Sequence, residues 1–98
     1  MTNAPTLSRT LRIGPESLAD RVPLDRQSRV PLHTQLRDGL ARMIATGYRD
    51  GDQFFAEREL VEALAVSRIT VRRALDDLAR QGHLIRAVGR GGTTVRIA

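Results

Sequence analysis

A mainly helical α+β fold is predicted for this chain by three observations. Three segments between residues 31 and 82 repeat apolar residues at spacings of three and four, which is typical of amphipathic helices. The second and third segments are separated only by "AVS", so the two helices must cross steeply, as in a helix-turn-helix. Beyond residue 82, two short runs of branched residues flank "GRGG", which favours a β-hairpin. Three helices followed by a hairpin form a winged helix-turn-helix.

Residues 1–30 differ in composition from the rest of the chain. They carry Pro5, Gly14, Pro15 and Pro23 among few large apolar residues. We interpret them as a flexible N-terminal arm with a short helix at "PESLADR", and residues 31–98 as the winged-helix domain. Arginines in the arm can extend along a nucleic acid, but acidic residues dilute them, so a solvated tail is an equal alternative.

The first helix is expected to begin at Pro31, because proline is favoured in a first turn, and to end at Gly47. An Asp-Gly turn and a short strand near residues 53–55 should follow it. The residues of its apolar stripe are Leu32, Leu36, Leu40, Met43 and Ile44.

The second helix fits "AERELVEALA", residues 56–65, with Leu60, Val61 and Leu64 on one face. The third should begin after Ser67 as N-cap and stop at Gly82. At 100° per residue its core face spans an arc of about 240° to 340° from Arg68. The residues of the core face of this third helix are Val71, Ala74, Leu75 and Leu78. The two strands are expected in "HLIRAV" and "TTVRIA".

Ile69 falls outside the apolar arc, at about 100° from Arg68, so its side chain should face solvent or a partner. A lone exposed isoleucine is common and needs no function. However, the first turn of the second helix in a helix-turn-helix is the part that enters the DNA major groove. There Ile69 can touch a thymine methyl group, the apolar mark on a major-groove base edge.

The polar residues around Ile69 suit the same partner. Arg68 and Arg72 lie one turn apart, and an arginine fork can hydrogen-bond guanine O6 and N7 together. Ser67 and Thr70 stand at the helix start, where free amides and the helix dipole favour a phosphate. A plain N-cap role for Ser67 is compatible with that contact.

Other arginines have competing interpretations. Arg58, in the first turn of the second helix, can contact the DNA backbone or a base, or can form an exposed pair with Glu62. Arg73 and Arg80 are more simply explained by solvated ion pairs with the neighbouring Asp76 and Asp77.

Composition narrows the class of function. Sixteen arginines against eleven acids give the 98-residue chain a net charge of +5, which suits a polyanionic partner, although a basic surface can also serve solubility alone. Without cysteine there are no disulfides or thiolate sites, and His33 and His83 have no companions at metal-binding spacing. We therefore expect the protein to bind no metal or cofactor and to have no enzymatic activity. No apolar run approaches the length of a membrane span, so we expect a cytoplasmic protein.

Three blocks, "PLHTQLRDGLARMIATG", "ERELVEALAVSRITVRRALDDLARQG" and "GRGGTTV", resemble the winged-helix DNA-binding domain of GntR-family bacterial transcription regulators. The opening "PLHTQL" looks most like the HutC branch. The resemblance implies a homodimeric regulator on a palindromic operator, with a small-molecule effector bound by a C-terminal domain that is absent from this chain. The positions that the resemblance assigns to DNA contact are Arg58, Ser67, Arg68, Thr70, Arg72, Gly89, Arg90 and Gly91.

Several positions depart from the family pattern. Phe55 and Ala56 replace its Pro-Ser, which removes a side-chain cap from the second helix. Ala65 replaces the usual glycine of the interhelical turn, which predicts a strained left-handed residue or a shifted turn. The wing has one glycine more than usual, and Thr94 takes the place of an aromatic residue.

The predicted function is sequence-specific DNA binding within a metabolite-responsive transcriptional repressor. The recognition helix would read the major groove, and Arg90 at the glycine-rich wing tip would enter the minor groove. The alternative is a winged helix that serves as a protein- or RNA-interaction module.

Overall fold

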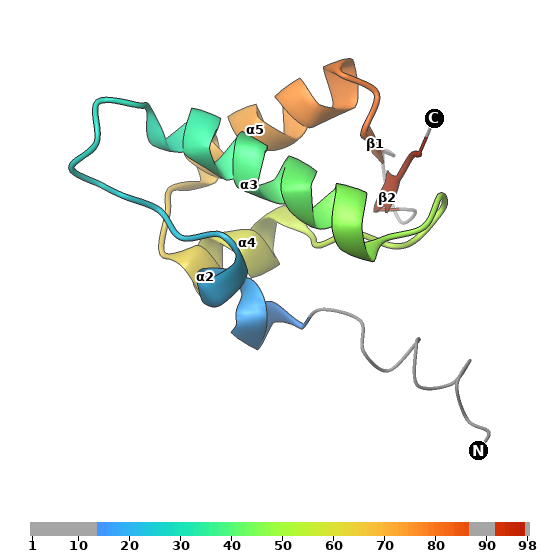
Figure 1. Ribbon diagram of the computed structural model, residues 1–98, viewed down its shortest axis with the longest axis horizontal. Coiled ribbons are helices and arrows are strands. Elements are labelled where there is room, and N and C mark those ends of the chain that lie inside the picture. The colour runs from blue at the N-terminus through green and yellow to red at the C-terminus, as the bar shows by residue number, and fades with distance from the viewer. Residues whose placement is uncertain (1–13, 87–91, 98) are drawn as a thin grey trace.

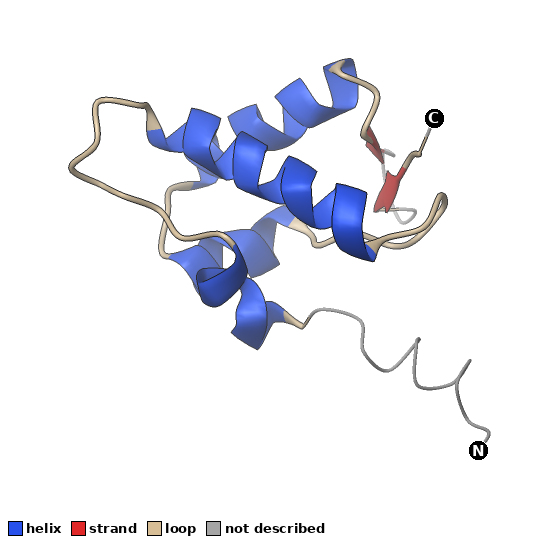
Figure 2. Cartoon of the chain, viewed as in Figure 1, coloured by secondary structure: helices blue, strands red, loops and turns tan. Residues whose placement is uncertain are grey.

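Residues 14–86 and 92–97 are described by the computed structural model, and they form helices that surround one apolar core, with a small sheet at one end (Figures 1 and 2). The three longest helices precede an antiparallel strand pair, which confirms the predicted winged helix-turn-helix. The elements in chain order are η1 (Pro15–Ser17), α2 (Leu18–Arg21), α3 (Leu32–Gly47), α4 (Glu57–Leu64), α5 (Arg68–Arg80), β1 (Leu84–Arg86) and β2 (Thr93–Val95).

Helix α3 runs across the centre of the molecule and packs chiefly on α5 (Figure 1). It starts after Pro31 and ends at Gly47, as predicted. Its expected apolar stripe faces the core, where four of the five residues are buried and Leu32 is partly buried. The predicted spacing therefore identified both the helix and its buried face.

The segment between α3 and α4 turns at Gly51, which adopts a φ of 87°. The short strand expected at residues 53–55 is reduced to a single β-bridge between Gln53 and Thr94. Phe54 and Phe55 are both buried, whereas a strand would alternate its faces. Backbone hydrogen bonds still join the segment to β2, because the Phe54 N–H donates to the Thr93 carbonyl and the Val95 N–H donates to the Asp52 carbonyl, both at 2.8 Å.

Helix α4 begins without a complete cap, as its sequence predicted. The Ala56 N–H donates to Glu59 Oε1 at 2.9 Å, but the Ala56 methyl group cannot accept a bond in return. At the other end, Ala65 adopts φ 53° and ψ 47°, which confirms a left-handed residue in the interhelical turn.

Helix α5 begins after Ser67, whose hydroxyl accepts from the Thr70 N–H at 3.1 Å. It ends before Gly82, which has a φ of 88°. All four residues of its predicted core face are buried. Both signals read from the sequence, the N-cap and the glycine stop, are confirmed.

The strands are shorter than the sequence suggested. Leu84 pairs with Val95 and both side chains are buried, while Ile85 faces outward opposite Thr94. Residues 87–91, which contain the expected wing tip, lie outside the described residues.

The short helix predicted at "PESLADR" is confirmed as η1 and α2, but the prediction that this segment belongs to a flexible arm is wrong for residues 14–30. Leu18 and Val22, one helical turn apart, are buried in the core. The Gln35 side chain holds the loop between α2 and α3 in place. Its Oε1 accepts from the Asp25 N–H and its Nε2 donates to the Val30 carbonyl, both at 2.8 Å. The prolines pointed to an extended tail, but two well-spaced apolar residues were enough to dock this segment.

Candidate nucleic-acid interface

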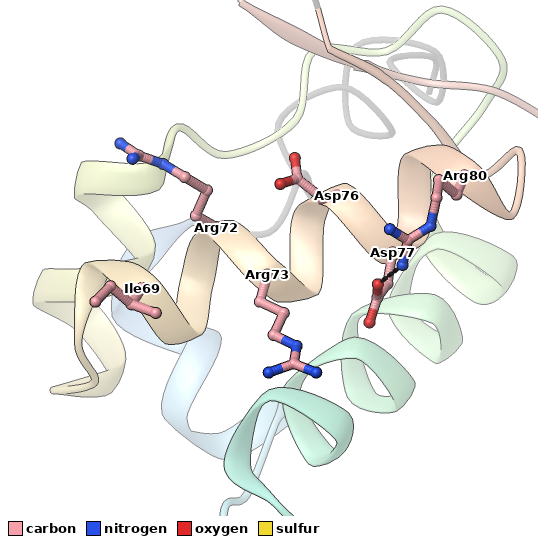
Figure 3. A pocket seen from close by; sticks show the side chains of 6 residues that line it. All are labelled: Ile69, Arg72, Arg73, Asp76, Asp77 and Arg80. Carbon is pink, nitrogen blue, oxygen red and sulfur yellow. Dashed lines mark hydrogen bonds and ion pairs between the residues drawn. The ribbon is translucent and has the colours of Figure 1, made fainter.

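The outer face of α5 holds the central predicted contact, Ile69. Its side chain is 78% exposed, which confirms that Ile69 lies outside the core. It borders a shallow hollow of about 360 Å³ on the helix surface (Figure 3). The residues that line this hollow are Ile69, Arg72, Arg73, Asp76, Asp77 and Arg80.

The start of α5 is suited to an anion. Ser67 Oγ accepts from the Thr70 N–H and donates to Thr70 Oγ1 at 2.9 Å, so the two predicted residues form one polar cap. Amides in the first turn of a helix have no acceptor within the helix, and the dipole is positive there. The exposed Arg68 side chain beside them forms no hydrogen bond or ion pair within residues 14–86 and 92–97. This end therefore offers unpaired positive charge.

Arg72 is held by a carboxylate that sequence reasoning missed. Its Nε donates to Glu57 Oε2 and its Nη2 to Glu57 Oε1, both at 3.2 Å. The hydrogen bonds from Arg72 lower the pKa of the Glu57 carboxyl group. Burial raises this pKa, and the contact with Arg86 lowers it further, so that the net shift is downward. The contact with Glu57 raises the pKa of Arg72, so the pair is ionised at neutral pH.

Arg86 of β1 completes this arrangement. Its Nη2 donates to Glu57 Oε2 at 2.6 Å, and its Nη1 donates to Asp76 of α5. We call Glu57, Arg72, Asp76 and Arg86 the charged cluster. Glu57 is 15 residues from Arg72 and 29 from Arg86 in the chain, so no local sequence pattern could reveal the contact.

Two further arginines, Arg58 and Arg80, each have two interpretations, DNA contact or an ion pair with a nearby carboxylate. Arg58 pairs with Glu62 at 3.5 Å, and both side chains are exposed, so the pair contributes only about 0.3–0.5 kcal/mol and can open readily. Arg80 pairs with Asp77, as predicted (Figure 3).

The predicted pairing of Arg73 is wrong within the described part of the chain. Asp76 is occupied by Arg86, and Asp77 by Arg80 and, at 3.9 Å, by Arg37. Arg73 is left exposed at the rim of the hollow (Figure 3).

Not every predicted site residue can be placed. Gly89, Arg90 and Gly91 lie outside the described residues. In residues 14–86 and 92–97, no cluster of three or more His, Asp or Glu side chains is arranged to hold a metal ion. No helix in those ranges combines the length and hydropathy needed to cross a bilayer.

Comparison with known proteins places this geometry in a family context. Residues 32–95 match the sequence model described as "Bacterial regulatory proteins, gntR family". The chain is 38% identical over 69 residues to the transcriptional repressor NagR of Bacillus subtilis, and 44% identical over 68 residues to a probable fructoselysine utilization operon repressor of Escherichia coli. These matches cover 69% and 68% of this chain, but only 28% of either relative.

Solved structures agree on the architecture. YtrA from Sulfolobus acidocaldarius, a GntR-family transcription factor, superposes with a TM-score of 0.70 at 28% identity, over 80% of this chain and 82% of that one. A transcriptional antiterminator from Listeria monocytogenes also gives a TM-score of 0.70, at 24% identity, over 76% of this chain and 56% of that one. The second likeness concerns the fold alone.

Proposed function

Because this chain belongs to the GntR family of bacterial regulatory proteins, we propose that it is the sequence-specific DNA-binding domain of a transcriptional regulator. The observation that carries the proposal is the exposed start of α5, where three features share one surface. They are the first amides of the helix, the exposed Ile69, and the Arg68 side chain, which is unpaired among the described residues. This surface lies on the second helix of a helix-turn-helix, the element that enters the major groove.

In the proposed complex, Ser67 and Thr70 bind a phosphate at the start of α5. Arg68 and Arg72 read guanine edges, while Ile69 packs on a thymine methyl group. Arg58 leaves its weak pair with Glu62 to contact the backbone beside the groove.

The wing contributes separately. Gly89 and Gly91 would let the chain approach DNA closely while Arg90 enters the minor groove. This part of the proposal rests on the sequence and the family resemblance.

We propose that the intact protein is a homodimeric repressor on a palindromic operator, working in the bacterial cytoplasm and released by a small molecule bound in a C-terminal domain. Relatives named as repressors support this role. The opening "PLHTQL" supports the HutC branch in particular. Reading the gene downstream of residue 98 would test the effector domain and the branch.

The alternative, a winged helix that contacts protein or RNA, predicts that Arg68→Ala and Arg72→Ala leave DNA binding unchanged. Family membership and the unpaired charge at the start of α5 favour DNA instead. Membership of a family of regulatory proteins also favours a regulatory function over an enzymatic one.

The proposal is tested by titrating labelled duplexes, one selected from random sequence and one scrambled, at two salt concentrations. If roughly five phosphates are neutralised, log K should fall with log salt at a slope of about -4 to -5. Equal affinity for both duplexes would remove sequence specificity. A lack of binding at low salt would overturn the function.

Replacement of Ile69 by threonine tests the base contact. Because this side chain is 78% exposed, Ile69→Thr should leave the free energy of unfolding within about 0.5 kcal/mol of wild type. Threonine keeps one methyl group but adds a hydroxyl that can hydrogen-bond other base edges, so the preferred base should change at one operator position. Repeated site selection and urea unfolding measure the two effects, and a loss of stability with an unchanged base preference would contradict the contact.

A further inference from the structure

We propose that Glu57 is a positioning residue for base recognition: its carboxylate fixes the guanidinium group of Arg72 and ties it to Arg86 of β1. The inference rests on the proposed DNA-binding function and deepens it. Arg72 and Arg86 come from two different elements, and both donate to this one carboxylate of α4.

The hydrogen bonds leave one edge of Arg72 open. A guanidinium group has five N–H donors, arranged so that it can bind side-on through Nε and Nη2 or end-on through Nη1 and Nη2. Glu57 accepts side-on, from Nε and Nη2. Nη1 and the second Nη2 hydrogen remain, which is the pair of donors that guanine O6 and N7 require.

Holding Arg72 in advance should sharpen recognition. A long arginine side chain loses rotamer freedom when it binds, and a contact formed before binding reduces that loss. The Arg72 side chain is 56% exposed, so packing does little to fix it, and Glu57 supplies its two side-chain hydrogen bonds. Without Glu57, the guanidinium group could turn toward any nearby phosphate.

Glu57 is itself held firmly. Its side chain is 22% exposed, and the Arg86 side chain that donates to it is 24% exposed and also contacts Asp76. The charged cluster contains two carboxylates and two guanidinium groups, so its formal charge is zero. It should therefore add little general attraction to DNA and act through geometry, unlike the unpaired Arg68.

The experiment compares wild type with Glu57→Gln and with the control Asp38→Asn, which removes the same charge from an exposed site on α3. Each chain is titrated with the duplex that wild type selects and with duplexes in which each guanine is replaced in turn. Glu57→Gln should reduce discrimination at one guanine by up to about tenfold, because Arg72 remains but makes a poorer bidentate contact. Asp38→Asn should leave discrimination unchanged.

A double-mutant cycle shows whether Glu57 acts through Arg72. In an Arg72→Ala background, Glu57→Gln should cause no further loss at that guanine. Thermal unfolding of each variant is recorded in parallel. If Glu57→Gln does not fold, Glu57→Asp keeps the negative charge between the two arginines but draws the carboxylate back by one methylene, and a loss at the same guanine is expected.

The outcomes separate the two proposals. Wild type that does not bind duplex DNA at low salt overturns the proposed function and this inference together. If wild type and Glu57→Gln discriminate equally well between the selected duplex and the duplexes with a replaced guanine, the inference alone is overturned. A loss that persists in the Arg72→Ala background also overturns it, because Glu57 would then act on the fold and not on Arg72.

Discussion

Ala65 is a left-handed residue without the freedom of glycine. Its φ of 53° is tolerated while Arg26 Nη2 donates to the carbonyl groups of Leu64 and Ala65, both at 3.0 Å. A residue other than glycine in the left-handed region costs about 1–2 kcal/mol of stability. A glycine gives the unfolded chain more conformational freedom, which lowers stability by about 0.4–1 kcal/mol. The strain outweighs the entropy.

Ala65→Gly should therefore raise the free energy of unfolding by up to about 1.5 kcal/mol. Urea unfolding measures the change. As a control, Ala45→Gly at an exposed helical position should lower stability by up to about 1 kcal/mol. Equal losses at both positions would contradict the strain at Ala65.

The Glu57 carboxyl group should make stability depend on pH. Because its pKa is lowered in the folded protein, its charge stabilises the fold above the ordinary value of 4.5, and that contribution is lost as the pH falls through the folded value. The difference in free energy of unfolding between wild type and Glu57→Gln should be constant from neutral pH to about 5 and shrink below it. Chemical unfolding from pH 7 to 3 measures this difference, and one that stays constant would show that the Glu57 pKa is not lowered.

At the scale of elements, Val22, the residue that follows α2, approaches α3 closely enough to require a glycine. A Cβ atom on Gly39 would lie 2.6 Å from Val22 Cγ1, and the branched valine has little freedom to move away. Gly39→Ala gains about 1 kcal/mol of helix propensity but overpacks this contact, which typically costs about 1–3 kcal/mol.

We expect Gly39→Ala to destabilise wild type but to be neutral or stabilising in a Val22→Ala background, where the methyl group is gone. Thermal unfolding of the four chains of this cycle gives the coupling. Additive effects would contradict the close approach of Val22 to α3.

At the scale of the whole molecule, the segment before α3 is part of the domain. Leu18 and Val22 lie in the core, and Arg26 Nη2 donates to the carbonyl groups of Leu64 and Ala65. Figure 1 shows α2 beside α4. Deleting residues 1–28 should lower the free energy of unfolding by roughly 3–5 kcal/mol, because large buried side chains are lost.

The shorter deletion of residues 1–13 is the matched control, since it removes no described core residue and should leave stability unchanged. It is also the cleaner test of a basic arm, because it removes Arg9 and Arg12 without disturbing the core. Equal stability of both shortened chains would contradict the docking of residues 14–28. Circular dichroism on heating distinguishes the outcomes.

The sequence by itself determined the helices, their buried faces and the exposure of Ile69. These features depend on spacing within one helix, as do the Ser67 cap, the left-handed Ala65 and the incomplete cap at Ala56. Each is a contact between residues only a few positions apart, so local geometry decides it.

Only the tertiary structure decided that residues 14–30 dock on the core and that Arg86, not Arg73, neutralises Asp76. It also decided that Glu57 joins α5 to β1. These contacts link residues from different elements, and which side chains meet depends on how helices cross and strands pair. Arginines with several carboxylates within reach cannot be assigned from spacing, because the nearest partner in space need not be near in the chain.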